Sequence, residues 1–458
     1  MDIPYATEQQ KRVVVVGAGF AGLTLAKKLS PRHFQILLLD KNNYHQFQPL
    51  LYQVATAGLE PSSISFPLRK VFQQKPNIFI RVAEVQQILP AEKAIETTIG
   101  KIDYDYLVLA HGAETNFFDN ANTQHYGYSM KSVSEALLIR NTLLKNFEQA
   151  LIAATEAERN ALLNVVIVGG GPTGVELAGA VAEMKNKLLP KDYPELNFSA
   201  MHIYLLEAAP GLLNGMSAAS STKVTEYLKG LGVQVQIQTA VQDYDGHTVY
   251  LNNGTTLQSR CLIWAAGVKG AVIAGLPQEV LLPNKRIVVN EYNAVKGFDA
   301  VFALGDIACM VSEQNPKGHP QVAPVAIQQA QLLAVNLKRL LTQQSLLPFA
   351  YRNKGSMATV GRNLAVAELG KIKIKGFIAW MAWMFVHLMS VIGVKNRLFI
   401  LINWIWQYIT YDQSLRLIIK ATEKKKPLIC PETRKRITIS AKHFTVNSNY
   451  QEILRQVQ

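Results

Sequence analysis

The chain has 458 residues, 49% of them hydrophobic, and its 47 basic residues outnumber its 33 acidic residues, which gives a net charge of +14. This length accommodates two or three domains with real cores, and the apolar content excludes a chain that is disordered throughout. Cys261, Cys309 and Cys430 lie far apart without paired spacing, which argues against a disulfide framework, a zinc site or an iron–sulfur cluster. We expect no metal site.

The first 12 residues are polar and lack the apolar core of a secretory signal, so we expect the chain to stay on the cytoplasmic side. The positive charge is compatible with nucleic acid, an anionic membrane or an acidic partner. No nucleic-acid recognition motif accompanies it, and we expect no nucleic-acid partner.

The first predicted element is a buried strand at residues 13–16 that leads into a G-x-G-x-x-G turn and a helix. In such a turn the first glycine makes the bend, the second lets the backbone approach a pyrophosphate, and the third lets the helix pack on the strand. The helix N-terminus then offers free N–H groups to the phosphates. The next apolar run, residues 36–39, ends in Asp40, which is placed to bind a ribose hydroxyl. The turn consists of Gly17, Ala18, Gly19, Phe20, Ala21 and Gly22.

The next two segments connect this unit to a second one. Residues 102–110 predict one buried strand that runs into Gly112 and Ala113, small residues that leave room beside a cofactor. Residues 132–153 predict a helix with Ser132 or Ser134 as its N-cap.

A second apolar strand, residues 165–168, leads into a second glycine turn. The acidic partner of this turn is Glu207, which directly follows the apolar residues 203–206. Its distance from Gly174 is longer than usual, and we attribute the excess to a polar stretch at residues 185–199. A carboxylate there accepts from a 2′-hydroxyl and repels a 2′-phosphate, so we expect NADH to be preferred over NADPH. The alternative is a solvated carboxylate at a strand end. The turn consists of Gly169, Gly170, Gly171, Pro172, Thr173 and Gly174.

Two later strands also end in small residues. The strand at residues 261–267 has this pattern, and the strand at residues 301–306 ends in Gly305 and Asp306 before an apolar helix at residues 324–341. A carboxylate such as Asp306 can accept from a sugar or ribityl hydroxyl. We therefore expect the first domain to be discontinuous.

The C-terminal part is the most apolar. Residues 376–394 contain no charged residue except His387, and a second run, residues 398–411, is rich in tryptophan and tyrosine. The first run is just long enough to span a bilayer, but the second is too short to return, and its aromatic residues suit the headgroup level. We expect two helices that lie in one leaflet, flanked by basic residues at 371–375, 424–426 and 434–436. A helical hairpin of a soluble core and a true membrane span remain alternatives.

These motifs together resemble the type II NADH dehydrogenases, single-chain flavin enzymes that pass electrons from NADH to a membrane quinone. The resemblance covers residues 12–417. It implies an α/β fold with two Rossmann-like dinucleotide-binding domains and a C-terminal helical membrane-anchoring region. The domains would be an FAD-binding domain (1–125 and 290–370), an NADH-binding domain (126–289) and a membrane-associating region (371–458). The resemblance rests on residues 17–22, 112–118, 169–179, 264–268, 305–306, 323–329 and 383–396.

The resemblance also implies which residues bind each ligand. FAD would be held by Gly17, Ala18, Gly19, Phe20, Ala21, Gly22, Asp40, Lys41, Val85, Ala110, Gly112, Gly305, Asp306 and Ala323. NADH would be held by Gly169, Gly170, Gly171, Pro172, Thr173, Gly174, Glu176, Glu207, Ala266 and Gly267.

Two residues are candidates for the chemistry. Glu176 resembles the family's acid near the nicotinamide and the flavin, although it could be a first-turn acid that complements its helix dipole. Gln328 matches a glutamine beside the flavin, whereas Pro324 replaces the family's other glutamine and removes an amide donor. Gln48, Pro324 and Gln328 are the candidate quinone contacts.

The implied function is hydride transfer from NADH to FAD and transfer of two electrons to quinone without proton pumping. The enzyme would lie on the cytoplasmic face of the inner membrane and contact lipid through residues 376–411; a homodimer is left open. Two alternatives remain. One is a soluble flavin-dependent NADH reductase of another acceptor, and the other is a slow-turnover NADH-binding flavoprotein regulator.

Overall fold

The computed structural model describes residues 10–313, 315–411 and 415–418, which all belong to one compact unit. The predicted basic runs at 424–426 and 434–436, and most of the polar N-terminal segment, lie outside the described residues.

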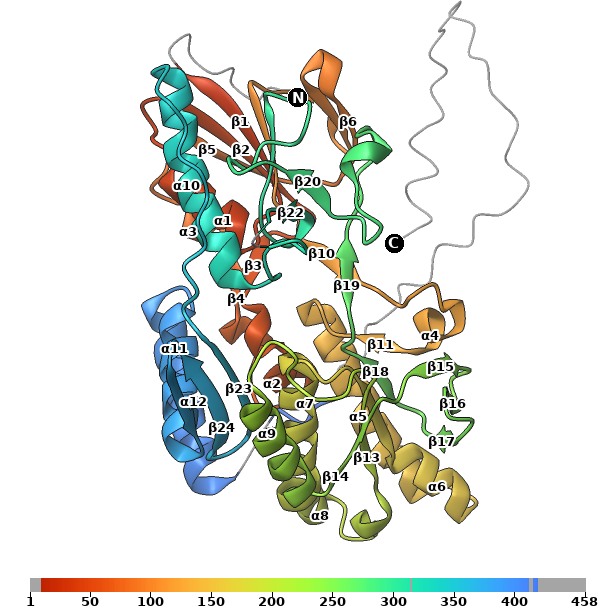
Figure 1. The fold of residues 1–458 in the computed structure, drawn as a ribbon. Helices are drawn as coiled ribbons and strands as arrows, with labels where there is room; N and C mark the ends of the chain where they lie inside the picture. Colours follow the sequence, from red (N-terminus) through yellow and green to blue (C-terminus); the bar gives the residue numbers. More distant parts are fainter. Residues whose placement is uncertain (1–9, 314, 412–414, 419–458) are drawn as a thin grey trace, which may run out of the picture. The chain divides into compact units, whose positions relative to one another are not determined.

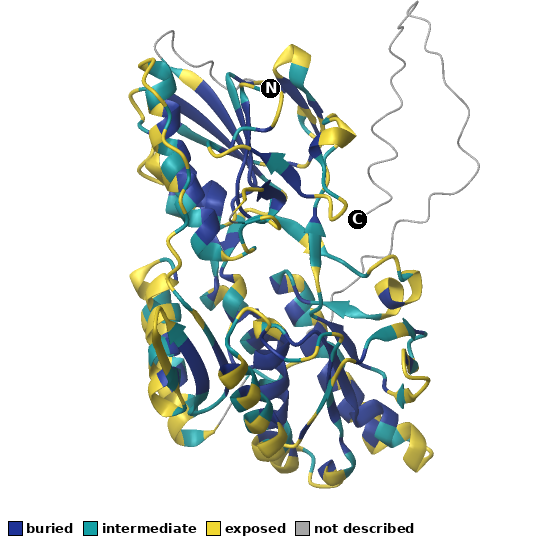
Figure 2. Ribbon diagram, in the orientation of Figure 1, coloured by how far each residue is buried: buried dark blue, intermediate teal, exposed yellow. Residues whose placement is uncertain are grey.

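The first of two large sheets has five parallel strands in the order β21-β9-β1-β2-β5 (Figure 1). Its central strand β1 is buried because helices pack against it; among them, α1 and α10 lie side by side. The edge strand β21 comes from a distant part of the chain and pairs Val301 with Leu107 of β9. Figure 2 shows the centre of this sheet as buried, whereas the edge strand β5 is buried only at Ile80. The elements are β1 (Lys11–Val16), α1 (Phe20–Lys28), β2 (Phe34–Asp40), β5 (Ile78–Val82), β9 (Tyr106–Leu109), β21 (Val301–Ala303) and α10 (Ala323–Leu341).

The second large sheet also has five parallel strands, in the order β11-β18-β12-β13-β14. Of the two predicted caps of the helix before β12, Ser132 is the N-cap: its Oγ accepts from the Glu135 N–H at 3.2 Å, and the Glu135 carboxylate accepts from Ser132 Oγ in return. The elements are β11 (Tyr128–Ser129), α5 (Val133–Leu151), α6 (Glu156–Leu163), β12 (Val165–Val168), α7 (Pro172–Glu183), α8 (Leu189–Asp192), β13 (Ile203–Glu207), α9 (Ala218–Gly230), β14 (Val233–Ile237) and β18 (Leu262–Trp264).

The predicted single strand at residues 102–110 is wrong, because the structure has two strands there. β8 (Gly100–Asp103) belongs to a small antiparallel sheet with β6 (Val85–Leu89) and β7 (Ala94–Thr97), whereas β9 belongs to the first large sheet. The strand is interrupted before Tyr106, at Asp105, whose carboxylate accepts from the Arg12 N–H at 2.7 Å. The physical reason is visible in the sequence: apolar and polar residues alternate up to Asp105, as in a half-exposed strand, and only then does a continuous apolar run begin.

The C-terminal region consists of an antiparallel sheet and two helices. The sheet has the strands β23 (Ser356–Gly361), β24 (Leu364–Leu369) and β25 (Ile372–Lys375), and β23 packs tightly on α7. The first predicted apolar run forms α11 (Phe377–Ser390) and the second forms α12 (Val394–Thr410). Within the described ranges, no helix has both the length and the apolar character needed to cross a membrane. Figure 2 shows much of the outer surface of both helices as exposed.

Shorter elements complete the described part of the fold. β10 and β19 form an antiparallel ribbon between the two large sheets. The shorter elements are β3 (Tyr44–Gln46), α2 (Leu51–Ala55), β4 (Ser65–Pro67), α3 (Leu68–Val71), β10 (Ala113–Thr115), α4 (Ala121–Tyr126), β15 (Val241–Tyr244), β16 (Thr248–Leu251), β17 (Thr256–Gln258), β19 (Val268–Gly270), β20 (Ile287–Val289) and β22 (Ala308–Met310).

Candidate functional site

The first glycine turn lies between β1 and α1. Gly17 has a φ of +97°, and a Cβ there would lie 2.5 Å from the Ala110 carbonyl oxygen. A Cβ at Gly22 would lie 1.9 Å from the Gly17 carbonyl oxygen, whereas a Cβ at Gly19 would meet no atom within 4 Å. The outer two glycines are therefore required by the packing of the protein itself. Gly19 instead leaves free space in front of the helix N-terminus, as a pyrophosphate needs.

The second turn repeats this geometry between β12 and α7. Gly169 has a φ of +112° and lies against Ala265, and a Cβ at Gly174 would lie 1.9 Å from the Gly169 carbonyl oxygen. A Cβ at Gly171 would meet no atom within 4 Å. Both turns thus fit a dinucleotide by the same criterion.

Each turn is held by the carboxylate at the end of the neighbouring strand. Asp40 Oδ2 accepts from the Ala18 N–H at 2.7 Å, and Glu207 Oε2 accepts from the Gly170 N–H at 2.5 Å. The second oxygen of each binds the N–H two residues further on, at Asn42 or Ala209, also at 2.7 Å. Burial raises the pKa of Asp40. Glu207 is therefore not a free solvated carboxylate, and the residues that lengthen its spacing form a π-helical turn (Met184–Leu188) and α8.

Both turns open onto one cavity of about 2150 Å³. All of the predicted FAD-binding residues except Gly22 line it, as do all three predicted quinone contacts. Of the predicted NADH-binding residues, Gly171, Pro172, Thr173, Glu176 and Gly267 line it. The others, Gly169, Gly170, Gly174, Glu207 and Ala266, are not among its lining residues.

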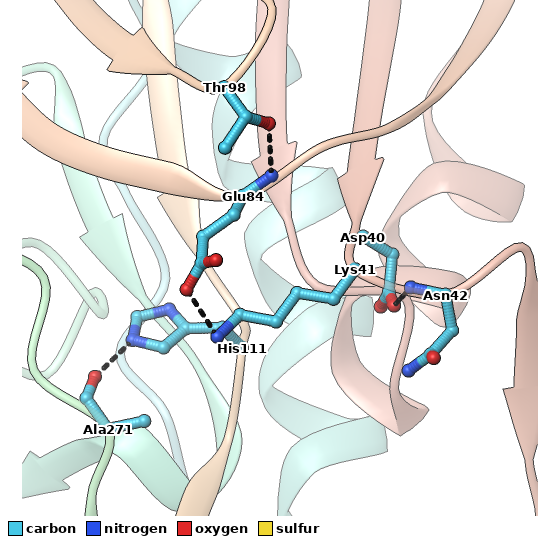
Figure 3. A network of polar contacts seen from close by, with 7 residues as sticks. All are labelled: Asp40, Lys41, Asn42, Glu84, Thr98, His111 and Ala271. Atoms are coloured by element: carbon cyan, nitrogen blue, oxygen red, sulfur yellow. Dashed lines mark hydrogen bonds and ion pairs between the residues drawn. The ribbon is translucent and has the colours of Figure 1, made fainter. Parts of the chain in front are cut away.

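A polar network lies at the Asp40 end of the cavity (Figure 3). Lys41 Nζ pairs with Glu84 Oε1 at 2.6 Å. His111, which follows Ala110, lies beside this pair, and its Nε2 bonds the Ala271 carbonyl oxygen at 2.6 Å. A carbonyl only accepts, so Nε2 has the proton, and the buried Nδ1 has no partner among the described residues. Burial lowers the pKa of His111 to about 4.

Glu176 lies on α7 and is buried, with 7% of its surface exposed. Its Oε1 accepts from Trp383 Nε1 at 3.0 Å and from the Thr359 N–H at 3.4 Å. Burial raises the pKa of Glu176 to about 8. The alternative of a first-turn acid is wrong, because the first turn of α7 contains no acidic residue. Glu176 is instead a carboxyl group that is mostly protonated at neutral pH and lines the cavity.

Three aromatic residues around Glu176 were not singled out from the sequence. Trp383 lies on α11, with its ring centroid 6.3 Å from that of Tyr52 and 4.1 Å from that of His387, which is stacked on it. His387 Nδ1 bonds the Trp383 carbonyl oxygen at 2.8 Å, and burial lowers the pKa of His387 to about 4. His387 was noted only as a polar residue within an apolar run; its i, i+4 spacing to Trp383 was the available signal.

The two predicted quinone amides bind main chain. Gln328 donates from Nε2 to the Arg352 carbonyl oxygen and accepts from the Arg352 N–H, both at 3.0 Å. Gln48 Nε2 donates to the Lys131 carbonyl oxygen at 3.3 Å. Pro324 occupies the first turn of α10. A role of these residues toward quinone stays a prediction.

Gly305 and Asp306 follow β21 at the cavity, as the sequence places them. The Gly305 N–H donates to Gln329 Oε1 at 2.8 Å, and Gln321 Nε2 donates to the Asp306 carbonyl oxygen at 2.9 Å. Gln329 is buried and fixes the turn from α10. Its role was not expected from the sequence.

Two parallel sheets, each with a glycine turn braced by a strand-end carboxylate and both facing one cavity, define a protein that brings two dinucleotides together. Residues 11–330 match the family model of pyridine nucleotide-disulphide oxidoreductases, and residues 353–410 match the NDH2 C-terminal domain. The chain belongs to the type II NADH:quinone oxidoreductase family, as the sequence motifs predicted.

Curated relatives agree with this assignment, and a solved structure has the same fold. The type II NADH:quinone oxidoreductase Ndh of Mycobacterium tuberculosis is 36% identical over 411 residues, which cover 86% of this chain and 88% of that protein. A type II NADH:quinone oxidoreductase of Staphylococcus aureus is 29% identical over 367 residues, which cover 77% of this chain and 88% of that protein. The structure of NDH2 from Plasmodium falciparum in complex with NADH has a TM-score of 0.82 at 22% identity and covers 90% of this chain and 100% of its own.

Proposed function

We propose that this protein oxidises NADH with a tightly bound, non-covalent FAD and passes two electrons to a membrane quinone. The observation that carries the proposal is the cavity of about 2150 Å³, which extends from both glycine turns to residues of the apolar helix α11. FAD, when bound, supplies the hydride acceptor and the two-electron donor. The protein's part is to place the two dinucleotides against each other and to exclude water between them.

The first turn is the FAD site in this proposal, and Gly19, Lys41 and Asp306 all line the space that the cofactor would fill. The FAD-binding domain comprises residues 1–125 together with the segment from residue 290, a division supported by the pairing of β21 with β9. We place its C-terminal limit before β23 and not at residue 370, because β23 packs on α7 of the NADH-binding domain, residues 126–289.

The second turn is the NADH site. Gly171 and Thr173 face the cavity at the N-terminus of α7, where the helix dipole favours phosphate. Glu207 holds the turn through the Gly170 N–H, and its carboxylate disfavours a 2′-phosphate at the adjoining ribose. NADH is therefore the proposed substrate.

In this proposal Glu176 holds a proton in the cavity that the two dinucleotides would share. Its buried carboxyl, with a pKa of about 8, is mostly protonated at pH 7 and lines the cavity. Quinone takes up two protons on reduction, and a protonated carboxyl can release one of them. Trp383 fixes the Oε1 atom of this carboxyl from α11.

The outer faces of α11 and α12 form the proposed membrane contact. Together they expose many large apolar side chains, and such a patch marks an interaction surface. Val386 is 44% exposed and also lines the cavity, so the lipid-facing surface and the cavity meet at this residue. We place the protein as a peripheral enzyme on the cytoplasmic face of the membrane. The exposed residues are Phe377, Ile378, Met381, Phe385, Val386, Met389, Val394, Leu398, Phe399, Ile402, Ile405, Trp406, Tyr408 and Ile409.

Anaerobic stopped-flow spectroscopy tests the function. NADH should bleach the flavin absorbance of the purified protein, and added quinone should restore it within the turnover time. Bleaching without faster reoxidation by quinone than by buffer alone would reject the quinone as acceptor. It would leave a reductase of another acceptor or a slow-turnover NADH-binding regulator. A redox disulfide is disfavoured, because the two cysteines in the described part, Cys261 and Cys309, are buried and neither lines the cavity.

A further inference from the structure

Glu368 of β24 binds the start of helix α9 from outside the NADH-binding domain. Its Oε1 accepts from the Ser217 N–H at 3.0 Å, from Ser217 Oγ at 2.5 Å and from Ser220 Oγ at 2.6 Å. Ser217 is the N-cap residue of α9, yet its own side chain caps no N–H of the helix. A carboxylate from a different part of the chain thus occupies the N-terminal end of α9, where negative charge is favourable.

The segment that α9 follows forms one wall of the cavity. Leu213, Asn214, Gly215 and Met216 line it just before Ser217. Leu213 has a φ of +51°, a left-handed conformation that is uncommon for leucine, and its N–H donates to the Gly170 carbonyl oxygen at 2.8 Å. The segment at residues 213–216 is therefore attached to the second glycine turn at one end and to Glu368 at the other.

Another part of the cavity lining comes from the same sheet as Glu368. Gly355, Ser356 and Met357, at the start of β23, line the cavity, as does Leu369, the neighbour of Glu368. Glu368 consequently connects two segments that line the same cavity. The hydrogen bonds from Ser217 and Ser220 lower the pKa of Glu368, so the carboxylate stays ionised at neutral pH.

We propose that Glu368 is a positioning residue for NADH, a proposal that rests on the NADH site proposed above. Glu368 fixes the N-terminus of α9 and thereby holds the segment 213–216 against the second glycine turn. Glu368 itself is not among the cavity-lining residues. Its effect is on the binding of the dinucleotide, through Leu213 and the turn. The candidate quinone contacts Gln48, Pro324 and Gln328 are not among the hydrogen-bond partners of Glu368.

The test is Glu368→Gln in the full-length protein, assayed with NADH and a water-soluble quinone. The neutral amide keeps the shape but loses the charge that three donors share, so the KM for NADH should rise about fivefold or more. The kcat and the KM for quinone should change less than about twofold. Hydrogen exchange followed by mass spectrometry should show faster exchange in residues 208–220, which a general loss of stability would not confine to this segment.

Glu226→Gln is the matched control, because Glu226 lies exposed on the same helix and forms an ion pair with Lys223 at the surface. It should leave both KM values unchanged. If Glu368→Gln fails to fold, Ser220→Ala removes one donor and should give a smaller rise in the KM for NADH with the same local exchange change. An unchanged KM for NADH, or equal effects on NADH and quinone, overturns the proposal. Titration of NADH binding, measured without quinone, keeps this result separate from a failure of the quinone reductase function.

Discussion

The indole N–H of Trp383 donates a 3.0 Å hydrogen bond to Oε1 of Glu176, across 207 residues of sequence. Through this bond the apolar helix α11 contacts the helix that begins at the second glycine turn. Both side chains are buried, with 1% and 7% of their surfaces exposed. The protonation state of this cavity-lining carboxyl group therefore depends on a residue of the proposed membrane-contacting region.

Replacing Trp383 with phenylalanine should change the pH dependence of the reaction. The indole N–H stabilises the ionised form of Glu176 and so lowers its pKa, against the larger effect of burial. Without this donor the pKa should rise above about 8, and the inflection of the kcat/KM profile should move about one pH unit to the alkaline side. Trp406→Phe is the control, since Trp406 is 59% exposed on α12. An unshifted profile would mean that Trp383 does not lower the pKa of Glu176.

Glu176→Gln should alter how stability depends on pH. The unfolded chain releases the Glu176 proton near its ordinary value of 4.5 and the folded chain near 8, so the folded state binds more protons between these values and wild-type stability falls as pH rises. Glutamine mimics the protonated form and removes this loss, which is at most about 5 kcal/mol. The Tm of the variant relative to wild type should therefore increase from pH 5 to pH 8.5 in differential scanning calorimetry. A pH-independent difference would contradict a raised pKa.

Two glycines of the second turn should respond differently to alanine. A Cβ at Gly171 meets open space, so Gly171→Ala should keep the Tm within a few degrees but weaken NADH binding tenfold or more, because the methyl group occupies the place of the pyrophosphate. A Cβ at Gly174 lies 1.9 Å from the Gly169 carbonyl oxygen, so Gly174→Ala should destabilise the fold by about 3 kcal/mol. NADH titration and thermal unfolding of both variants make the comparison. Equal effects in both measurements would mean that Gly171 has no ligand in front of it.

The two strand-end carboxylates should prove to have different ligands. Glu207→Gln should reduce the preference for NADH over NADPH at least tenfold, since the amide no longer repels a 2′-phosphate. Asp40→Asn, at the equivalent position of the first turn, should instead lower the FAD content of the purified protein and leave the nucleotide preference unchanged. The measurements are kcat/KM for both nucleotides and flavin absorbance per chain. If Asp40→Asn, and not Glu207→Gln, changes the preference between NADH and NADPH, the assignment of the two sites is reversed.

Membrane attachment should depend on the exposed face of α11 and α12. Phe385→Glu combined with Ile409→Glu places two charges on side chains that are 65% and 72% exposed, so it should release the protein from anionic liposomes without unfolding it. NADH oxidation with a water-soluble quinone should fall less than about twofold. The control is Leu138→Glu combined with Ile152→Glu, which should leave liposome binding unchanged. Leu138 lies on α5, Ile152 directly follows this helix, and both are exposed. Point substitutions are preferable to deletion from Lys371, which would also remove Trp383 from the buried site.

Much of the fold was predictable because the two turns have strong local patterns. A continuous apolar run, a glycine turn and an acid at the next strand end are all determined within about 40 residues, and Asp40 lies where this pattern places it. The alternation of apolar and polar residues up to Asp105 indicates the division of residues 102–110 into two strands, but which sheet each strand joins depends on partners elsewhere in the chain, such as β1 for β9.

The candidate site was less predictable for the same reason. The burial of Glu176, its bond to Trp383 and its raised pKa arise from the tertiary arrangement that brings the Trp383 side chain of α11 to α7, which no spacing in the sequence encodes. Gln328 shows the converse: the residue type suggested a ligand contact, but its amide binds the Arg352 backbone at both ends. A local motif identifies where a ligand can approach, whereas the chemistry of a side chain depends on neighbours from other parts of the chain.

The two-sided character of α11 has a consequence for inhibition. Val386 and Phe385 face outward from this helix, whereas Trp383, less than one turn away, bonds the buried acid. A hydrophobic compound that arrives through the bilayer would meet the support of Glu176 without entering by the nucleotide side. Its potency would then rise with its partition into lipid and would not be relieved by excess NADH.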